Sequence, residues 1–138
     1  MVPRELIFLP FTWTAKNISY RLRVEGKKHI PQKGGALLIC NHVSYVDWLL
    51  VAAGLDRSVR FVIDHSYFRG VLSKPLLSLA GVIPIAGGRE DPARLGQAYQ
   101  GIAGALESGE LVCLFPEGRI THDGKIGPFK PGVIKIIK

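Results

Sequence analysis

The chain has 138 residues, of which 47% are hydrophobic and 21% are charged. This length fits one domain with a packed core, and the composition excludes an intrinsically disordered protein. The net charge is +7, from 18 Lys and Arg residues against 11 Asp and Glu residues. A basic surface attracts nucleic acids, anionic lipid headgroups or phosphorylated substrates, and charge alone does not choose among these partners.

Residues 1–19 are expected to form an N-terminal helical or interfacial segment. The apolar stretch 6–11 is shorter than the ~18 residues that a membrane-spanning helix needs. It also lacks the basic region and the cleavage site of a signal peptide, so none is expected. Two interpretations stay open: the stretch lies in a membrane interface with Trp13 as an anchor, or it covers the core.

Apolar runs then alternate with turn residues along the chain. Residues 20–26 alternate polar and apolar side chains, which predicts a half-exposed strand. The continuous apolar run 36–40 is typical of a buried parallel strand. Residues 47–53 predict a helix that ends at Gly54. A further strand is predicted over 59–63.

The second half of the chain continues the same rhythm. Residues 68–79 are expected to be helical, with an internal glycine and proline that affect the shape of the helix. Residues 82–85 predict a short strand whose proline indicates a sheet edge. Asp91 is a good N-cap for a helix that Gly109 ends. Residues 111–115 predict another buried strand, followed by a loop rich in Gly and Pro that extends to about residue 132.

Alternating strands and helices predict an α/β fold, with an open and mostly parallel sheet flanked by helices. Functional sites in such folds lie at the carboxyl ends of the strands. Two predicted strand ends carry unusual polar residues. Asn41 and His42 follow one strand, and residues 116–119 follow the last one.

His42 stands five positions before Asp47, which begins a predicted helix. The two side chains can converge over the turn, so that the carboxylate accepts one imidazole N–H and fixes the tautomer of a general base. An aspartate at a helix start is also a common cap of backbone N–H groups. The spacing alone therefore leaves both interpretations open, and Ser44 beside His42 is expected to be a turn residue.

Two further turns carry arginine near the expected edge of the sheet. Residues 115–119 combine a carboxylate, a flexible Gly118 and the fork of Arg119, which suits a phosphate. Residues 83–89 again lead from a strand through glycines to a cation, Arg89. A solvated turn with surface ion pairs is the alternative interpretation of each.

Together these segments resemble the glycerophospholipid acyltransferases, a family that includes lysophosphatidate acyltransferases. Residues 41–47, 81–89 and 114–119 are similar to the family's first three sequence blocks, in the right order. The third of these is most similar to 2-acylglycerophosphoethanolamine acyltransferase domains of bacterial fusion proteins. The resemblance implies catalytic roles for His42 and Asp47, and substrate-binding roles for Asn41, Arg89, Glu117, Gly118 and Arg119.

The resemblance also implies the reaction and its setting. The expected function is transfer of an acyl chain from acyl-CoA or acyl-carrier protein to a lysophospholipid hydroxyl, with no cofactor and no metal. The acceptor is lysophosphatidate or 2-acylglycerophosphoethanolamine. The expected partners are these substrates, the carrier protein and a membrane surface, and the expected location is peripheral, at the cytoplasmic face of the inner membrane or within a membrane-anchored protein.

The family's fourth block does not appear before Lys138, and residues 133–138 resemble the start of the helix that leads to it. Residues 20–138 are therefore expected to be an acyltransferase catalytic domain that is incomplete at its C-terminus. An alternative is a catalytically inactive fragment that binds lipid or membrane. A truncated domain would also leave part of its apolar face uncovered.

Two other functions carry less support. A metal hydrolase would draw on His and Asp side chains, but paired ligand spacing is missing. A nucleic-acid binder is not expected, because the cations are scattered and are not interleaved with aromatic residues. The ligands of such a metal hydrolase would be His42, Asp47, Asp64, His65, His122 and Asp123.

Cys40 and Cys113 lie in apolar runs and are expected to be free buried thiols.

Overall fold

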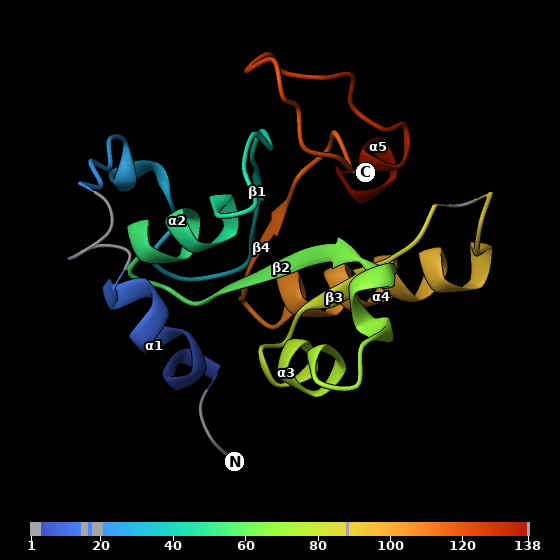
Figure 1. Ribbon diagram of the computed structural model, residues 1–138, viewed down its shortest axis with the longest axis horizontal. Coiled ribbons are helices and arrows are strands. Elements are labelled where there is room, and N and C mark those ends of the chain that lie inside the picture. Colours follow the sequence, from blue (N-terminus) through green and yellow to red (C-terminus); the bar gives the residue numbers. More distant parts are fainter. Residues whose placement is uncertain (1–3, 15–16, 18–20, 88, 138) are drawn as a thin grey trace.

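The computed structural model describes residues 4–14, 17, 21–87 and 89–137. Its centre is a four-stranded sheet in the order β1-β4-β2-β3, in which every pair of neighbouring strands is parallel. Figure 1 shows β4 in the middle of the sheet, between β1 and β2. The strands are β1 (Ala36–Ile39), β2 (Val59–Asp64), β3 (Ile83–Ile85) and β4 (Leu111–Leu114).

These strands confirm the predicted open α/β fold. β4 is the most apolar strand and is buried along its whole length, as a central parallel strand must be. Cys113 in β4 is paired with Leu38 on one side and with Phe61 on the other. β3 lies at an edge of the sheet, which agrees with the proline inside it.

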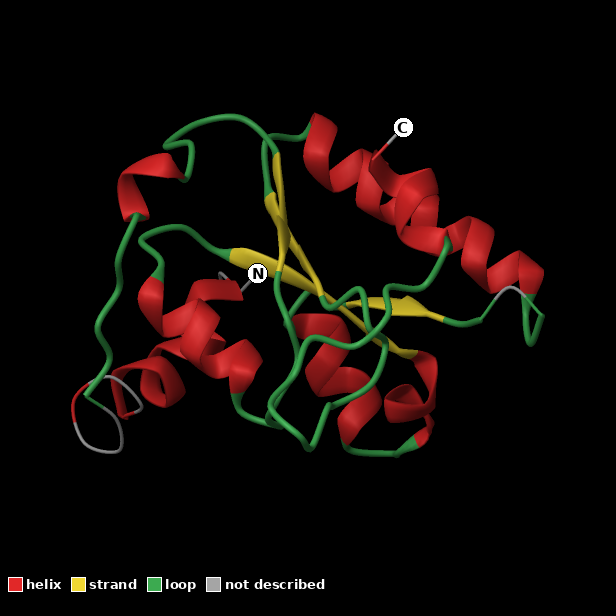
Figure 2. Ribbon diagram, turned by 90° about the horizontal axis from the view of Figure 1, so that it is seen from above, coloured by secondary structure: helices red, strands yellow, loops and turns green. Residues whose placement is uncertain are grey.

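Helices cover both faces of this sheet, and Figure 2 shows the strands between two groups of helices. α4 and α5 pack on one face, and α2 packs on the other. The helices are α1 (Arg4–Thr14), α2 (Asp47–Gly54), α3 (Ser73–Leu79), α4 (Pro92–Glu107) and α5 (Gly132–Ile137), with short 3-10 helices η2 (Lys27–His29) and η3 (His65–Arg69).

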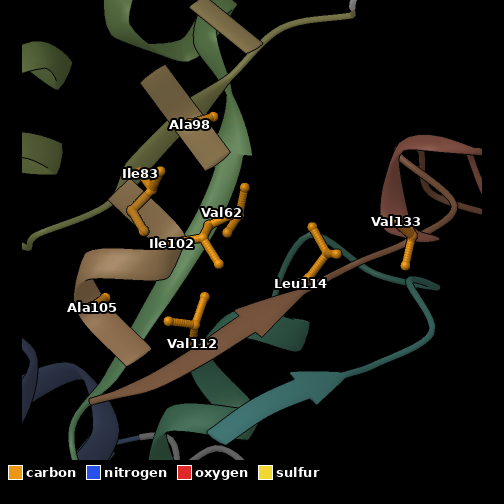
Figure 3. Packing of buried hydrophobic residues seen from close by; sticks show 8 residues of the cluster. All are labelled: Val62, Ile83, Ala98, Ile102, Ala105, Val112, Leu114 and Val133. Carbon is orange, nitrogen blue, oxygen red and sulfur yellow. The ribbon is translucent and has the colours of Figure 1, made fainter. Parts of the chain in front are cut away.

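The core has one apolar cluster on each face of the sheet. In the cluster under α4, Ile102 is 2% exposed and Val112 is fully buried. Figure 3 shows these side chains converging from α4, the strands and α5. Each such side chain stabilises the fold by about 1.5–3 kcal/mol relative to an exposed one. The other cluster joins Phe61 and Leu111 to Trp48 of α2.

α4 begins and ends where the sequence predicts. The Asp91 side chain accepts a hydrogen bond from the backbone N–H of Arg94 at 2.9 Å, and Pro92 occupies the first helical position. Gly109 follows the helix with a φ of +80°, a left-handed conformation that glycine adopts without strain. The chain is thereby returned to the start of β4.

The prediction of a strand over residues 20–26 is wrong for the part that the structure describes. Tyr20 lies outside the described residues, and residues 21–26 have no partner strand. Their alternation has another cause. Leu22 and Val24 pack against Gly54 at the end of α2, where a Cβ would lie 3.2 Å from a Val24 methyl group. One face of the segment thus contacts α2 without a ladder of backbone hydrogen bonds, although Val24 stays 43% exposed.

The single helix predicted over residues 68–79 is also corrected. The segment divides into the end of η3, a break at Gly70 with extended backbone, and α3. The Ser73 hydroxyl donates to the carbonyls of Tyr67 and Gly70, at 2.7 and 3.3 Å, and holds the break. Pro75 lies in the first turn of α3, where a missing N–H leaves no intrahelical bond unmade.

α1 accounts for the helical part of the predicted N-terminal segment. Phe11 and Trp13 on this helix are 56% and 59% exposed. Among the described residues, no helix combines the length and the apolar character needed to cross a membrane. The interfacial role of the segment stays a prediction.

Candidate functional site

The site lies at the carboxyl ends of β1 and β4. Because these strands are parallel neighbours, their following loops start at the same edge of the sheet. We call residues 40–47 the His42 loop and residues 115–131 the Glu117 loop. The backbone N–H of Cys40 still bonds to the carbonyl of Leu114 at 3.0 Å, so the two loops leave the sheet side by side.

In the His42 loop, His42 and Asp47 form a hydrogen-bonded pair. The distance from His42 Nδ1 to Asp47 Oδ2 is 3.0 Å, and the two side chains are 21% and 14% exposed. An ionised carboxylate only accepts hydrogen bonds, so Nδ1 carries the proton and Nε2 keeps a free lone pair. The His42 ring also stacks on Phe115, with ring centroids 4.3 Å apart. Both contacts restrict the orientation of the imidazole.

The same Asp47 oxygen also holds the turn before α2. It accepts hydrogen bonds from the backbone N–H groups of Val43 and Ser44, both at 2.8 Å. Burial works against the charged form of Asp47, but the bonds from His42 and from these two N–H groups outweigh it and lower the pKa of the carboxyl group. Both interpretations of the spacing therefore hold, because Asp47 contacts the imidazole and caps the turn.

The Glu117 loop holds the main chain of His42 from the other side. Glu117 Oε1 accepts the backbone N–H of His42 at 2.9 Å. The backbone N–H of Thr121 donates to the His42 carbonyl at 2.8 Å, and the Thr121 hydroxyl donates to the same oxygen at 3.2 Å. Both backbone polar groups of His42 are thereby fixed by one loop.

The second oxygen of Glu117 organises its own loop. Oε2 accepts the backbone N–H of Gly127 at 3.0 Å, and the residue is only 3% exposed. Both carboxylate oxygens thus bond to backbone N–H groups, one in each loop. A buried carboxylate needs such partners, since an unpaired buried charge is strongly unfavourable. Direct contact of Glu117 with a substrate stays a prediction, whereas its contact with His42 is a structural fact.

A large open cavity adjoins the pair. Its volume is about 1890 Å³, and His42, Gly118, Arg119 and Arg89 all line it. Arg89 and Arg119 are exposed and contact no carboxylate among the described residues. Asn41 is exposed as well but does not line the cavity. The structure therefore brings four of the seven predicted site residues to the lining of one cavity and leaves Asn41, Asp47 and the buried Glu117 outside this lining.

Apolar side chains line the same cavity. Those of α1, α3 and the Glu117 loop include Phe11, Leu76, Leu77 and Ile126. Phe11, Leu76 and Ile126 are more than half exposed. The cavity lining thus combines cations with apolar side chains, as a molecule with an anionic head and a hydrocarbon chain would require.

Cys40, at the start of the His42 loop, and Cys113 of β4 are free thiols, as predicted, but only Cys113 is buried and Cys40 is half-buried. Their sulfur atoms are 3.7 Å apart because β1 and β4 are neighbours. A hydrogen bond from Cys113 lowers the pKa of Cys40 to about 7, against the effects of burial and of Asp47. Neither sulfur lines the cavity.

Within the described part of the chain, no group of three or more His, Cys, Asp or Glu side chains is placed to hold a metal ion. Asp64 and His65 lie at the end of β2, and His122 and Asp123 are exposed in the Glu117 loop.

Sequence reasoning missed the roles of Glu117 and Thr121 in holding His42. An acid directly after a buried strand was a usable signal for the first, and no sequence signal identifies the second.

Comparison with known proteins gives a consistent result. The sequence profile of the family described as Acyltransferase matches residues 21–138. The chain is 27% identical over 132 residues to the chloroplastic 1-acyl-sn-glycerol-3-phosphate acyltransferase LPAT1 of Arabidopsis thaliana, and 26% identical over 132 residues to its counterpart BAT2 of Brassica napus. These matches cover 94% of this chain but 36% and 38% of the relatives. The chain thus spans a little over a third of their length, and no solved structure matches it.

Proposed function

Since the chain belongs to the acyltransferase family, we propose that it transfers an acyl chain from a thioester to the hydroxyl of a lysophospholipid. Family membership implies an acyl donor and an acceptor. The assignment of a lysophospholipid as the acceptor is supported by the similarity to 1-acyl-sn-glycerol-3-phosphate acyltransferases and by the cavity, whose lining contains both cations and apolar side chains. The observation that carries the proposal is the His42–Asp47 pair at the wall of this cavity.

The chemistry follows from the state of the imidazole. Asp47 accepts Nδ1–H, so Nε2 of His42 takes the proton of the acceptor hydroxyl as the oxygen attacks the thioester carbonyl. A new C–O bond forms and the C–S bond breaks. The imidazolium then returns its proton to the departing thiolate, and Asp47 stabilises the cation in between. No covalent acyl-enzyme is needed, which leaves Cys40, Cys113 and Ser44 without a nucleophilic role.

The substrates follow from the same cavity. We propose lysophosphatidate or 2-acylglycerophosphoethanolamine as the acceptor, with its phosphate near Arg89 and Arg119, and acyl-CoA or acyl-carrier protein as the donor. The apolar side chains that line the cavity would hold the hydrocarbon chain of a substrate. Exposed Phe11 and Trp13 on α1 support a peripheral position on a membrane, at the cytoplasmic face of the inner membrane or as a domain of a membrane-anchored protein.

A product assay tests the proposal. The purified protein is incubated with mixed lysophospholipids and either acyl-CoA or acyl-carrier protein, and products are identified by mass. We expect a diacyl phospholipid from the wild type and none above background from His42→Ala. Vesicle binding by both proteins, without product from either, would instead favour the inactive lipid-binding fragment.

A further inference from the structure

Lys130 lies across the turn that follows β4. Its backbone N–H donates to the carbonyl of Pro116 at 2.9 Å, which brings the end of the Glu117 loop back to its beginning. The side chain then runs over Gly118. A Cβ at Gly118 would lie 2.6 Å from Lys130 Cε and 2.9 Å from Nζ. A side chain at position 118 would have to displace the flexible end of Lys130, and the φ of +62° separately favours glycine.

Lys130 and His42 line the same cavity. Among the described residues, no carboxylate lies within ion-pair distance of the Lys130 ammonium. The charge of Lys130 acts electrostatically on Asp64 at the end of β2, beyond ion-pair distance. Burial opposes ionisation of Asp64, but hydrogen bonds from Ser66 and nearby positive charge, including that of Lys130, lower the pKa. The positive charge of Lys130, in the loop after β4, therefore reaches the carboxylate at the end of β2.

Some cations outside the cavity are paired with carboxylates. Arg60 pairs with Glu110 at 2.8 Å, and Arg94 pairs with Asp91 at 3.1 Å. The cavity instead gathers cations that no described carboxylate neutralises. Its charged lining consists of Arg89, Arg119, Lys125, Lys130 and Lys135, against Asp64 and Asp123. Such an imbalance favours an anionic ligand.

We propose that Lys130 binds the phosphate of the acceptor and that Gly118 contributes by leaving room for this lysine. The inference rests on the proposed function and adds a residue to it. Of the cavity cations, Lys130 is the one packed against the turn that carries Glu117, the residue bonded to the main chain of His42. A phosphate held there has its glycerol hydroxyl within the cavity that His42 lines.

Paired acceptors test the proposal. Lys130→Met keeps the length of the side chain and removes its charge, and Lys28→Met on η2 is the matched control. A hydrogen bond to a charged group corresponds to ~10- to 100-fold in binding. We expect Lys130→Met to raise the KM for lysophosphatidate by that factor and to leave transfer to monoacylglycerol, which lacks the phosphate, within ~2-fold. Lys130→Arg should recover most of the loss, and Lys28→Met should resemble the wild type.

A binding measurement separates this proposal from the proposed function. Calorimetric titration of His42→Ala protein with sn-glycerol 3-phosphate should show binding that weakens ~10- to 100-fold when Lys130→Met is added. This result supports the anion site even if the wild type makes no product, an outcome that would reject only the acyl transfer. Equal losses for both acceptors, or unchanged phosphate binding, would overturn the assignment of Lys130.

Gly118→Ala supplies an independent check. Alanine meets the lysine side chain and is strained at a φ of +62°. If alanine acts by displacing Lys130, adding Gly118→Ala to Lys130→Met should raise the KM for lysophosphatidate little further. Fully multiplicative effects of the two changes on this KM would contradict the shared role.

Discussion

The carboxylate of Glu117 accepts a hydrogen bond from the main-chain N–H of His42 at 2.9 Å, across 75 residues of sequence. This bond joins the loops that follow two neighbouring strands. The second carboxylate oxygen of Glu117 accepts the backbone N–H of Gly127, so both oxygens form hydrogen bonds within the protein. The closest effect of Glu117 on chemistry is therefore the position of the imidazole.

Glu117→Gln tests that position. An amide accepts through one oxygen only, and its NH₂ group meets the second backbone N–H as a donor facing a donor. The His42 loop should loosen, and a misplaced base should lower kcat by ~10-fold or more while the KM for the acceptor changes little. Steady-state kinetics measure both constants.

Glu107→Gln, at the exposed end of α4, is the matched control and should behave as the wild type. Circular dichroism verifies that both variants fold. A raised KM with an unchanged kcat would contradict a positioning role. It would instead support direct binding of the acceptor by Glu117.

The stability of the fold should depend on pH through Asp47. The pKa of this carboxyl group is lowered in the folded state. Its contribution is therefore present above the unfolded value of about 3.9 and is lost as the pH falls through the folded pKa. Asp47→Asn should be less stable by about 1–3 kcal/mol at neutral pH. Urea unfolding at several pH values should show this gap narrowing below about pH 4, and parallel curves would contradict the argument.

Two glycines give opposite predictions for stability. A Cβ at Gly35 would lie 2.0 Å from the backbone oxygen of Leu106, and backbone does not move aside. Gly35→Ala should therefore destabilise the fold by about 3 kcal/mol. Gly104 lies inside α4 with nothing within 4 Å of its Cβ position. Gly104→Ala should stabilise by about 0.5–1 kcal/mol, and thermal unfolding of both variants checks the contrast.

The central strand of the sheet is predictable because it is buried on both faces. The run 111–114 is apolar at every position, and that pattern identifies a central parallel strand. Residues 21–26 show where an alternating pattern fails to predict a strand. Alternation indicates that one side of a segment contacts the rest of the protein, and here Leu22 and Val24 contact Gly54 without any strand pairing.

In the candidate site, the sequence predicts the local contact but not the contacts between distant segments. The pairing of His42 with Asp47 follows from a local spacing of five residues, which a turn brings together. The contacts of Glu117 and Thr121 with the His42 main chain join loops far apart in sequence. They depend on the register of β1 against β4, which no local pattern encodes. The role of Lys130 depends on the return of a loop to its own start.

The most direct test of the central claim compares wild type, His42→Ala and Asp47→Asn in transfer of an acyl chain to lysophosphatidate. Asp47→Asn keeps the imidazole and removes the carboxylate that accepts Nδ1–H. Positioned base catalysis contributes ~10²–10⁴-fold, so both variants should lose kcat by that order while still binding the acceptor. Near wild-type turnover by both variants would contradict the account.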